Sequence, residues 1–200
     1  MSASATPYHH GDLRSALLTE ASAIVREQGV DGLSLRKLAE RTGVSRTAPY
    51  HHFRDKHALL CALAEQGFHQ LQDLMAAHTH REQTLTQRLN DFVHAYLHFA
   101  LEYPERYELM FGRTIWTSGE PTATLKHTAY QAFRSYLEQV QKLRADGNDR
   151  TALRVAQTTW ATLHGLCRLM LDGIYVNVGD MEEVAEQTVQ SMLSLLQHPA

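Results

Sequence analysis

The stretch that decides the fold runs from Ser34 to Phe53 and reads SLRKLAERTGVSRTAPYHHF. Ser34 offers a side-chain oxygen where the first backbone N–H groups of a helix need an acceptor, and apolar residues follow it at helical spacing. Gly43 can adopt the positive φ of a sharp turn, and Ser45 can cap a second helix. We therefore expect two short helices joined by a tight turn, a helix-turn-helix.

The second of these helices has two different sides. Tyr50 and Phe53 recur at three-residue spacing, which predicts that they pack inward. Arg46, Thr47, His51 and part of Tyr50 then face outward, and such a polar side can enter the major groove of DNA. The alternative is an ordinary pair of amphipathic helices whose polar sides meet only water, because this geometry also occurs without DNA.

Residues 8–60 resemble the N-terminal domain of TetR-type transcriptional regulators. The shared pattern is YHHGDLR at residues 8–14, followed by LxxLAxxxGVSxxAxYxHFxDKxxLL at residues 35–60. The resemblance implies a repressor that binds an inverted-repeat DNA operator as a homodimer and is released by a small effector molecule. It also implies base or nearby backbone contacts from Arg46, Thr47, Tyr50 and His51, phosphate contacts from Ser34, Arg36, His52 and Lys56, and a place for Ser45 in the same surface.

Pro49 departs from the family pattern, in which many members have an aliphatic residue. Proline removes a backbone donor and biases the preceding Ala48 away from helical angles. We therefore expect the recognition helix to start late or to have a distorted first turn.

Composition places the chain among ordinary globular helical proteins. It has 200 residues, of which 44% are hydrophobic and 20% charged, and helix-forming residues dominate. The net charge is -3, but the residues through Leu60 carry a net +2 and the remainder -5. This mild asymmetry favours DNA binding by the N-terminal part without proving it. The chain lacks an apolar run near the ~18 residues of a membrane span, so we expect a cytoplasmic protein with no membrane partner.

We expect an all-α fold of about nine helices in two domains, residues 1–60, with a flexible tail at 1–7, and residues 61–200. After the helix-turn-helix, Asp55 can cap a long helix that reaches about Ala77 and links the domains. Apolar periodicity and proline positions predict the later helices, and residues 113–119, which include Trp116, are expected to form a loop over a cavity. The expected later helices span 84–103, 105–112, 121–145 and two final segments around 156–174 and 181–196.

The last two helices carry more apolar surface than one neighbour can cover. This favours a four-helix dimer interface, and TetR-type regulators dimerise through their last two helices. The alternative is that both apolar stripes are used in the core of a single subunit. The residues assigned to the interface are Leu163, Met170, Met192 and Leu196.

The C-terminal part has a second, shorter resemblance. Residues 160–165, WATLHG, resemble the tryptophan-histidine-glycine (WHG) signature of one group of TetR effector domains. Gly165 inside a helix suggests that another helix packs closely there. The expected cavity has few charges, which suits an apolar or aromatic ligand, although ordinary core packing explains each residue alone. Its candidate residues are Tyr96, Phe99, Tyr103, Tyr107, Met110, Phe111, Trp116, Trp160 and His164.

Asp91, His94 and His98 fall on one helical face at spacings that could bring three metal ligands together. The alternative function is therefore a helical metalloprotein or hydrolase that uses this face. Exposed histidines on an amphipathic helix explain the same pattern, and the chain has no G-x-S-x-G, H-E-x-x-H, phosphate-loop or dinucleotide-binding motif. We therefore expect a protein that is not an enzyme and that needs neither a metal nor another cofactor.

Overall fold

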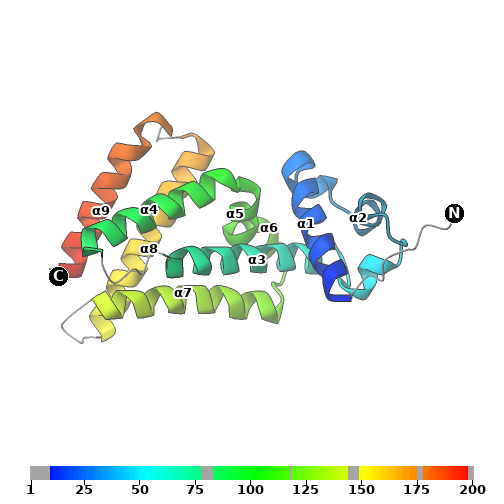
Figure 1. Ribbon diagram of the computed structural model, residues 1–200, viewed down its shortest axis with the longest axis horizontal. Coiled ribbons are helices and arrows are strands. Elements are labelled where there is room, and N and C mark those ends of the chain that lie inside the picture. Colours follow the sequence, from blue (N-terminus) through cyan, green and yellow to red (C-terminus); the bar gives the residue numbers. More distant parts are fainter. Residues whose placement is uncertain (1–9, 78–82, 118, 144–148, 175–177, 198–200) are drawn as a thin grey trace.

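The computed structural model describes residues 10–77, 83–117, 119–143, 149–174 and 178–197, and every regular element within these ranges is a helix. Figure 1 shows a small N-terminal lobe at one end of the molecule and a larger helical bundle at the other. The predicted all-α fold is confirmed. The lobe contains α1 (His10–Gln28), the 3-10 helix η1 (Val30–Gly32), α2 (Leu35–Thr42) and the 3-10 helix η2 (Ala48–His51). The bundle contains α3 (Lys56–Ala77), α4 (Leu85–Glu102), α5 (Pro104–Phe111), α6 (Arg113–Trp116), α7 (Ala123–Leu143), α8 (Asp149–Asp172), the 3-10 helix η3 (Val178–Asp180) and α9 (Met181–Gln197).

The first half of the helix-turn-helix has the predicted boundaries. The Ser34 side chain accepts a hydrogen bond of 3.1 Å from the backbone N–H of Lys37. Gly43 follows α2 with a φ of 68°, in the left-handed region where a residue with a Cβ is strained. Leu35 and Leu38 are buried against the core, so the capped helix is fixed on one side.

The second half differs from the prediction. The segment is a 3-10 helix, Ala48–His51, and the described chain has no α-helix between α2 and α3. Pro49 is buried and Phe53 is 2% exposed, but Tyr50 is 55% exposed and does not pack inward as predicted. Pro49 lacks the N–H that an α-helix needs. The 3-10 helix ends at His51, so Phe53 lies beyond it, and the three-residue spacing does not place Tyr50 and Phe53 on one helical side.

The long helix α3 joins the two parts of the molecule. Asp55 caps it, because its Oδ1 accepts a hydrogen bond of 2.8 Å from the backbone N–H of Ala58. The helix ends at Ala77 as predicted, and it packs against α1 in the lobe and against α4, α5 and α7 in the bundle. Figure 1 shows it lying along α7 across the length of the bundle. The expected domain boundary near residue 60 therefore lies inside a continuous helix.

The segment expected to be a loop at residues 113–119 is partly helical. Arg113–Trp116 forms α6, and the Trp116 indole N–H donates a hydrogen bond of 2.7 Å to the Met110 carbonyl. This bond holds the short helix against the end of α5. The predicted tail at 1–7 and most of the expected connections at 78–83 and 146–149 lie outside the described residues.

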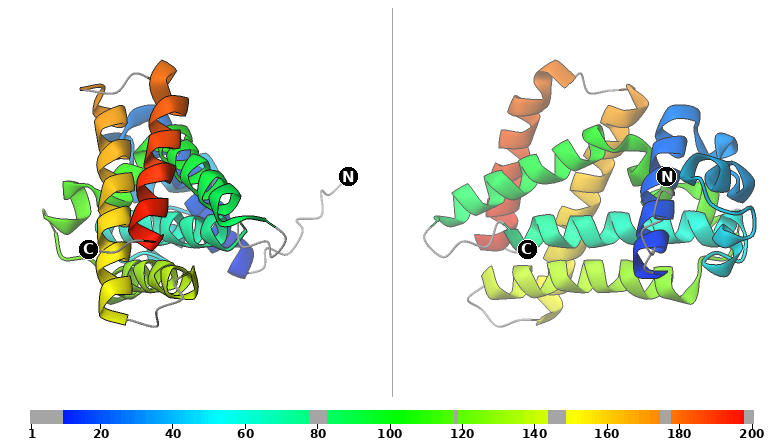
Figure 2. Two further views of the ribbon diagram at one scale, coloured as in Figure 1. Left: turned by 90° about the vertical axis from the view of Figure 1, so that its left-hand side faces the viewer. Right: turned by 45° about the vertical axis from the view of Figure 1, so that its right-hand side comes forward.

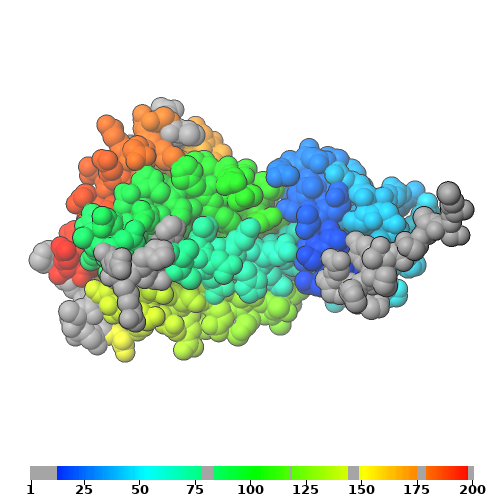
Figure 3. Space-filling view, in the orientation of Figure 1, coloured from blue at the N-terminus to red at the C-terminus, as the bar shows by residue number. Residues whose placement is uncertain are grey.

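The last two helices stand side by side at the end of the bundle away from the lobe, as the left view of Figure 2 shows. Both pack against α4, and α8 also packs against α7. The space-filling view in Figure 3 shows the lobe as a separate mass that meets the bundle over a limited area.

Candidate functional site

The outer surface of the helix-turn-helix carries four side chains that can bind DNA. Arg46, Thr47, Tyr50 and His51 are all exposed. Within the described residues, no carboxylate forms an ion pair with Arg46, so its charge is available to a partner. Ser45, also exposed, has its hydroxyl 3.2 Å from that of Thr47. A cation, hydroxyls, a phenol and an imidazole are thus presented by one short segment.

The predicted phosphate contacts surround this segment, but their side chains are not equally available. Ser34 is used as the cap of α2, and the Arg36 Nε donates to Glu40 Oε1 at 3.2 Å on the exposed side of the same helix. Lys56 is the first residue of α3 and is partly exposed beside the positive end of the helix dipole. His52 is partly buried, with its ring 6.3 Å from that of Phe53. Lys56 is the best placed of the four for a phosphate.

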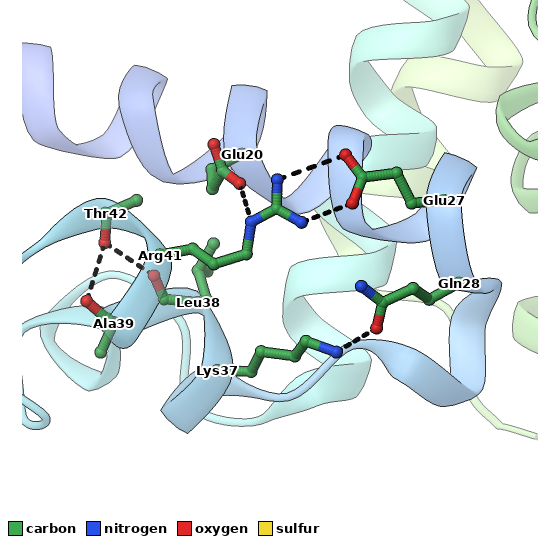
Figure 4. Close-up of polar contacts among 8 residues, drawn as sticks. All are labelled: Glu20, Glu27, Gln28, Lys37, Leu38, Ala39, Arg41 and Thr42. Carbon is green, nitrogen blue, oxygen red and sulfur yellow. Dashed lines mark hydrogen bonds and ion pairs between the residues drawn. The ribbon is translucent and has the colours of Figure 1, made fainter.

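Two further cations of the lobe, Arg41 and Lys37, contact other residues of the same chain. The sequence did not predict these contacts. Figure 4 shows Arg41 of α2 reaching to α1, where it pairs with both Glu20 and Glu27. Its Nη1 and Nη2 donate to Glu27 at 2.6 Å and 3.3 Å. Lys37 donates to the Gln28 side chain. Their positive charge therefore stabilises the position of α2 on α1.

The Glu27–Arg41 ion pair is expected to give the lobe a pH-dependent part of its stability. The hydrogen bond from Arg41 lowers the pKa of Glu27 below its ordinary value. A lowered folded-state pKa means that this stabilisation is complete above the unfolded-state pKa and is lost as the pH falls through the folded value. Urea unfolding should therefore show Glu27→Gln to be less stable than wild type at pH 7, with the difference shrinking in acid. An equal difference at both pH values would contradict this role.

An aromatic pocket of about 290 Å³ lies in the bundle. Four of the predicted ligand residues, Met110, Phe111, Trp116 and Trp160, line it. All the side chains of its described lining are apolar or aromatic, which suits a ligand of the same character. The remaining lining residues are Phe68, Ala129 and Phe133.

Three other predicted ligand residues, Tyr96, Tyr107 and His164, lie behind this pocket. Tyr96 and Tyr107 are 1% and 0% exposed. The Tyr107 hydroxyl is 2.7 Å from His164 Nδ1, and the two rings stack with their centroids 5.6 Å apart. Burial raises the pKa of Tyr107, whereas burial and the nearby Arg168 lower the pKa of His164. The Tyr107 hydroxyl and His164 Nδ1 therefore form a hydrogen bond between two groups whose charged forms are disfavoured by burial. His164 also contacts Phe111 at the pocket, with 4.8 Å between the ring centroids.

Removing the Tyr107 hydroxyl is expected to destabilise the bundle. Tyr107→Phe keeps the ring but leaves the half-buried His164 Nδ1 without its hydrogen-bond partner, at a cost of about 1 kcal/mol. Tyr130→Phe is the matched control, because Tyr130 is 60% exposed and its change should leave the free energy of unfolding nearly unaltered. Equal stability of the two variants in urea unfolding would show that the Tyr107–His164 hydrogen bond contributes nothing.

The last two predicted ligand residues are placed elsewhere. Phe99 and Tyr103 line a separate groove with α3 residues that include Gln70 and Asp73. The predicted set of nine is thus divided between the aromatic pocket, the core behind it and this groove.

The four predicted dimer residues are buried within the single chain. Leu163, Met170, Met192 and Leu196 are 0%, 5%, 3% and 7% exposed. These four residues therefore belong to the core of the single subunit, which is the alternative that the sequence left open. The outward sides of the two helices consist of other residues, among them Thr158, Thr162, Leu169 and Ser191.

The face proposed for a metal does not bring its side chains together. Asp91 accepts a hydrogen bond of 2.8 Å from Gln83, and His94 Nε2 lies 3.7 Å from a carboxylate oxygen of Glu182 on α9. Among the residues that the structure describes, no three His, Cys, Asp or Glu side chains gather as metal ligands. The metalloprotein alternative therefore has no geometric support in this part of the chain.

Polar contacts connect the lobe to the bundle. Arg106 of α5 is partly buried, and its Nη2 donates a hydrogen bond of 2.8 Å to Ser22 of α1. Its Nη1 donates to Gln70 of α3. Beside it, Gly67 allows α3 and α5 to approach closely, because a Cβ there would lie 2.4 Å from the Met110 sulfur. The lobe that carries the exposed segment at residues 45–51 and the helices that line the aromatic pocket are thus packed against each other.

Comparison with known families agrees with this architecture. A profile described as "Bacterial regulatory proteins, tetR family" matches residues 17–63, and one described as "Tetracyclin repressor-like, C-terminal domain" matches residues 89–192, which is more than half of the chain. The chain belongs to the TetR family of bacterial regulatory proteins. This TetR-family protein is therefore a transcriptional regulator with a helix-turn-helix, a class whose members are typically not enzymes.

Individual relatives resemble this TetR-family regulator over different lengths. The class A tetracycline repressor from transposon 1721 of Escherichia coli is 55% identical over 51 residues, which cover 26% of this chain and 24% of that protein. The transcriptional repressor AcnR of Corynebacterium glutamicum is 28% identical over 161 residues, 80% of this chain and 78% of AcnR. The strong local identity is thus confined to about a quarter of the tetracycline repressor.

A solved structure resembles the TetR-family regulator over nearly its whole length. A protein of unknown function from Rhodococcus sp. RHA1 has a TM-score of 0.76 and 34% identity, and the match covers 94% of this chain and 98% of that one. None of the helices in the described ranges is long and apolar enough to cross a membrane.

Proposed function

We propose that this TetR-family regulator is a cytoplasmic repressor that binds an inverted-repeat operator as a homodimer. The observation that carries the proposal is the exposed surface formed by Arg46, Thr47, Tyr50 and His51. These side chains contact base edges or the nearby backbone, while Lys56, with Ser34, Arg36 and His52 around it, lies along the phosphates. AcnR, which resembles most of this chain, is itself named a transcriptional repressor.

Dimer formation uses the outward side of α8 and α9 in this proposal. Thr158, Thr162, Gly165 and Leu169 follow one another along one side of α8, and Leu169 is an exposed large apolar residue. A Cβ built on Gly165 would meet nothing within 4 Å, so the close partner expected beside this glycine is not among the described residues of the same chain. A second subunit packed here gives two reading surfaces related by two-fold symmetry, as an inverted repeat requires.

Release by a ligand uses the aromatic pocket. We assign the effector domain, within residues 61–200, to the WHG group, because Trp160 lines the pocket and His164 adjoins it. Phe68, which also lines the pocket, belongs to α3, the helix that begins at Lys56 beside the operator. An apolar or aromatic ligand moves α3 and changes the separation of the two lobes, a coupling of about 1–3 kcal/mol.

Selection of bound duplexes from a random pool tests the proposal. The enriched sequences should contain inverted repeats whose halves are about one helical turn, ~34 Å, or a multiple of it apart. Small apolar and aromatic molecules should then release the selected duplex in competition assays. Sedimentation should give a dimer, and Leu169→Arg should weaken both dimerisation and duplex binding. Tyr130→Arg, at a more exposed position on α7, should affect neither.

A protein that remains monomeric and enriches no sequence at physiological salt would refute the proposal. A dimer that selects a duplex but is not released by any apolar or aromatic molecule would refute only the assigned ligand class.

A further inference from the structure

A second cavity lies at the end of the bundle farthest from the lobe. Its volume is about 60 Å³, and it is partly open to the surface. It lies where the end of α3, the start of α4 and parts of α7, α8 and α9 meet, toward the left of Figure 1. It shares no lining residue with the aromatic pocket. Most of its lining is apolar, and the side chains are Met75, Arg88, Leu89, Phe92, Tyr136, Gln139, Val140, Leu143, Val155, Thr159, Met192 and Leu196.

One polar group of this lining has no partner. The Nε of Arg88 is buried and makes no hydrogen bond within the described residues, nor does a described carboxylate form an ion pair with its guanidinium. Asp91, less than one helical turn away, is bonded to Gln83 instead. A buried donor without an acceptor is costly, and more so on a charged group, so the site favours an acceptor supplied from outside.

The hydroxyl groups of the lining do not fill this role, because they satisfy one another. The hydroxyls of Tyr136 and Thr159 lie 2.7 Å apart, and Thr159 donates to the Val155 carbonyl at 2.8 Å. The Tyr136 phenol therefore donates to Thr159, and its burial raises its pKa, so it stays neutral. Arg88 is therefore the one positively charged side chain of the described lining, which is otherwise mostly apolar.

We propose that this cavity binds a short aliphatic carboxylate, with its charged group on Arg88 and its carbon chain among the apolar side chains. A guanidinium pairs with a carboxylate through two parallel hydrogen bonds, which gives both strength and orientation. A single cation matches a single negative charge. An apolar cavity of about 150 Å³ admits benzene, and this one is less than half as large. It therefore holds only the short carbon chain, and the carboxylate lies beside it at the partly exposed Arg88.

The proposal concerns a ligand site and does not depend on whether the chain recognises an operator, because the binding is measured without DNA. Calorimetry and thermal unfolding of the full chain are carried out with butyrate and isovalerate and with their neutral counterparts, butyramide and isovaleramide, at matched ionic strength. Both carboxylates should bind saturably and raise the melting temperature. Their affinity should exceed that of the amides by at least about tenfold, because only they form the charge-assisted pair.

Two kinds of variant locate the site. Arg88→Gln should reduce carboxylate affinity to that of the amides, whereas Arg134→Gln, on the exposed side of α7 where Arg134 pairs with Glu138, should bind as wild type does. Val140→Phe fills the cavity and should abolish binding of all four compounds, and Val155→Leu is the milder filling change if the first does not fold. The proposal is overturned if carboxylates and amides bind equally, if Arg88→Gln leaves the affinity unchanged, or if none of the four compounds binds saturably.

Discussion

Phe53→Ala is expected to destabilise the N-terminal lobe by about 3–5 kcal/mol and to abolish duplex binding with it. The reading segment is a 3-10 helix of four residues, Ala48–His51, which cannot hold its own shape through a series of α-helical hydrogen bonds. Its position depends on the buried side chains of Pro49 and Phe53, with the Arg14 guanidinium 5.4 Å from the Phe53 ring centroid. Removing the Phe53 ring should therefore free residues 48–51 from their position on the lobe.

Tyr50→Ala is the matched control for this change. Tyr50 lies three residues away in the same segment and is 55% exposed, so its removal should leave the urea midpoint nearly unaltered. Phe53→Leu should restore much of the lost stability, because it refills most of the site. The proposed anchoring would be wrong if Phe53→Ala unfolded at the same urea concentration as wild type while losing DNA binding.

The second large effect is a division of roles between Lys56 and Tyr50 on DNA. Lys56→Ala is expected to weaken binding to every duplex by a similar factor and to reduce the slope of log K against log salt by about one per subunit. Tyr50→Ala is expected to cost about 1–3 kcal/mol per half-site on the preferred operator and to change which sequences are preferred. We expect this role for Lys56 because it begins α3, soon after the exposed segment at residues 45–51, whereas Tyr50 belongs to that segment and is exposed.

Binding titrations over a range of salt concentrations, on the selected operator and on variants changed at single positions, separate the two roles. Lys142→Ala is a suitable control for charge alone, because Lys142 is exposed in the last turn of α7, at the end of the bundle away from the lobe. An equal loss on every operator variant for both Lys56→Ala and Tyr50→Ala would refute the division.

The fold could be predicted from the sequence wherever local chemistry decides it. Ser34 and Asp55 cap helices as expected, Gly43 has the positive φ that its position requires, and α3 ends at the predicted Ala77. These features depend on neighbouring residues, which a sequence displays directly. Pro49 also predicted a distorted recognition helix. It did not predict that a 3-10 helix would replace the α-helix and leave Tyr50 exposed.

The candidate sites were less accessible to sequence reasoning, because they depend on how helices cross. The Arg41–Glu27 pair joins residues 14 positions apart on two helices, and no periodic pattern marks it. Leu163 and Met192 lie on apolar stripes that could face either the core or a second subunit, and the stripe alone does not distinguish the two. Likewise, the sequence could not predict that the buried Nε of Arg88 has no hydrogen-bond partner among the described residues, because this depends on how the surrounding helices pack.

The crossing of α3 and α5 at Gly67 has a mechanical consequence. Here the two helices are in such close contact that a methyl group in place of the glycine hydrogen would meet the Met110 side chain. Arg106 at the same crossing is bonded to Ser22 of α1. A tilt of α3 at this point must therefore carry α5 and α1 with it, so the lobe should swivel as a rigid block instead of bending at its joint.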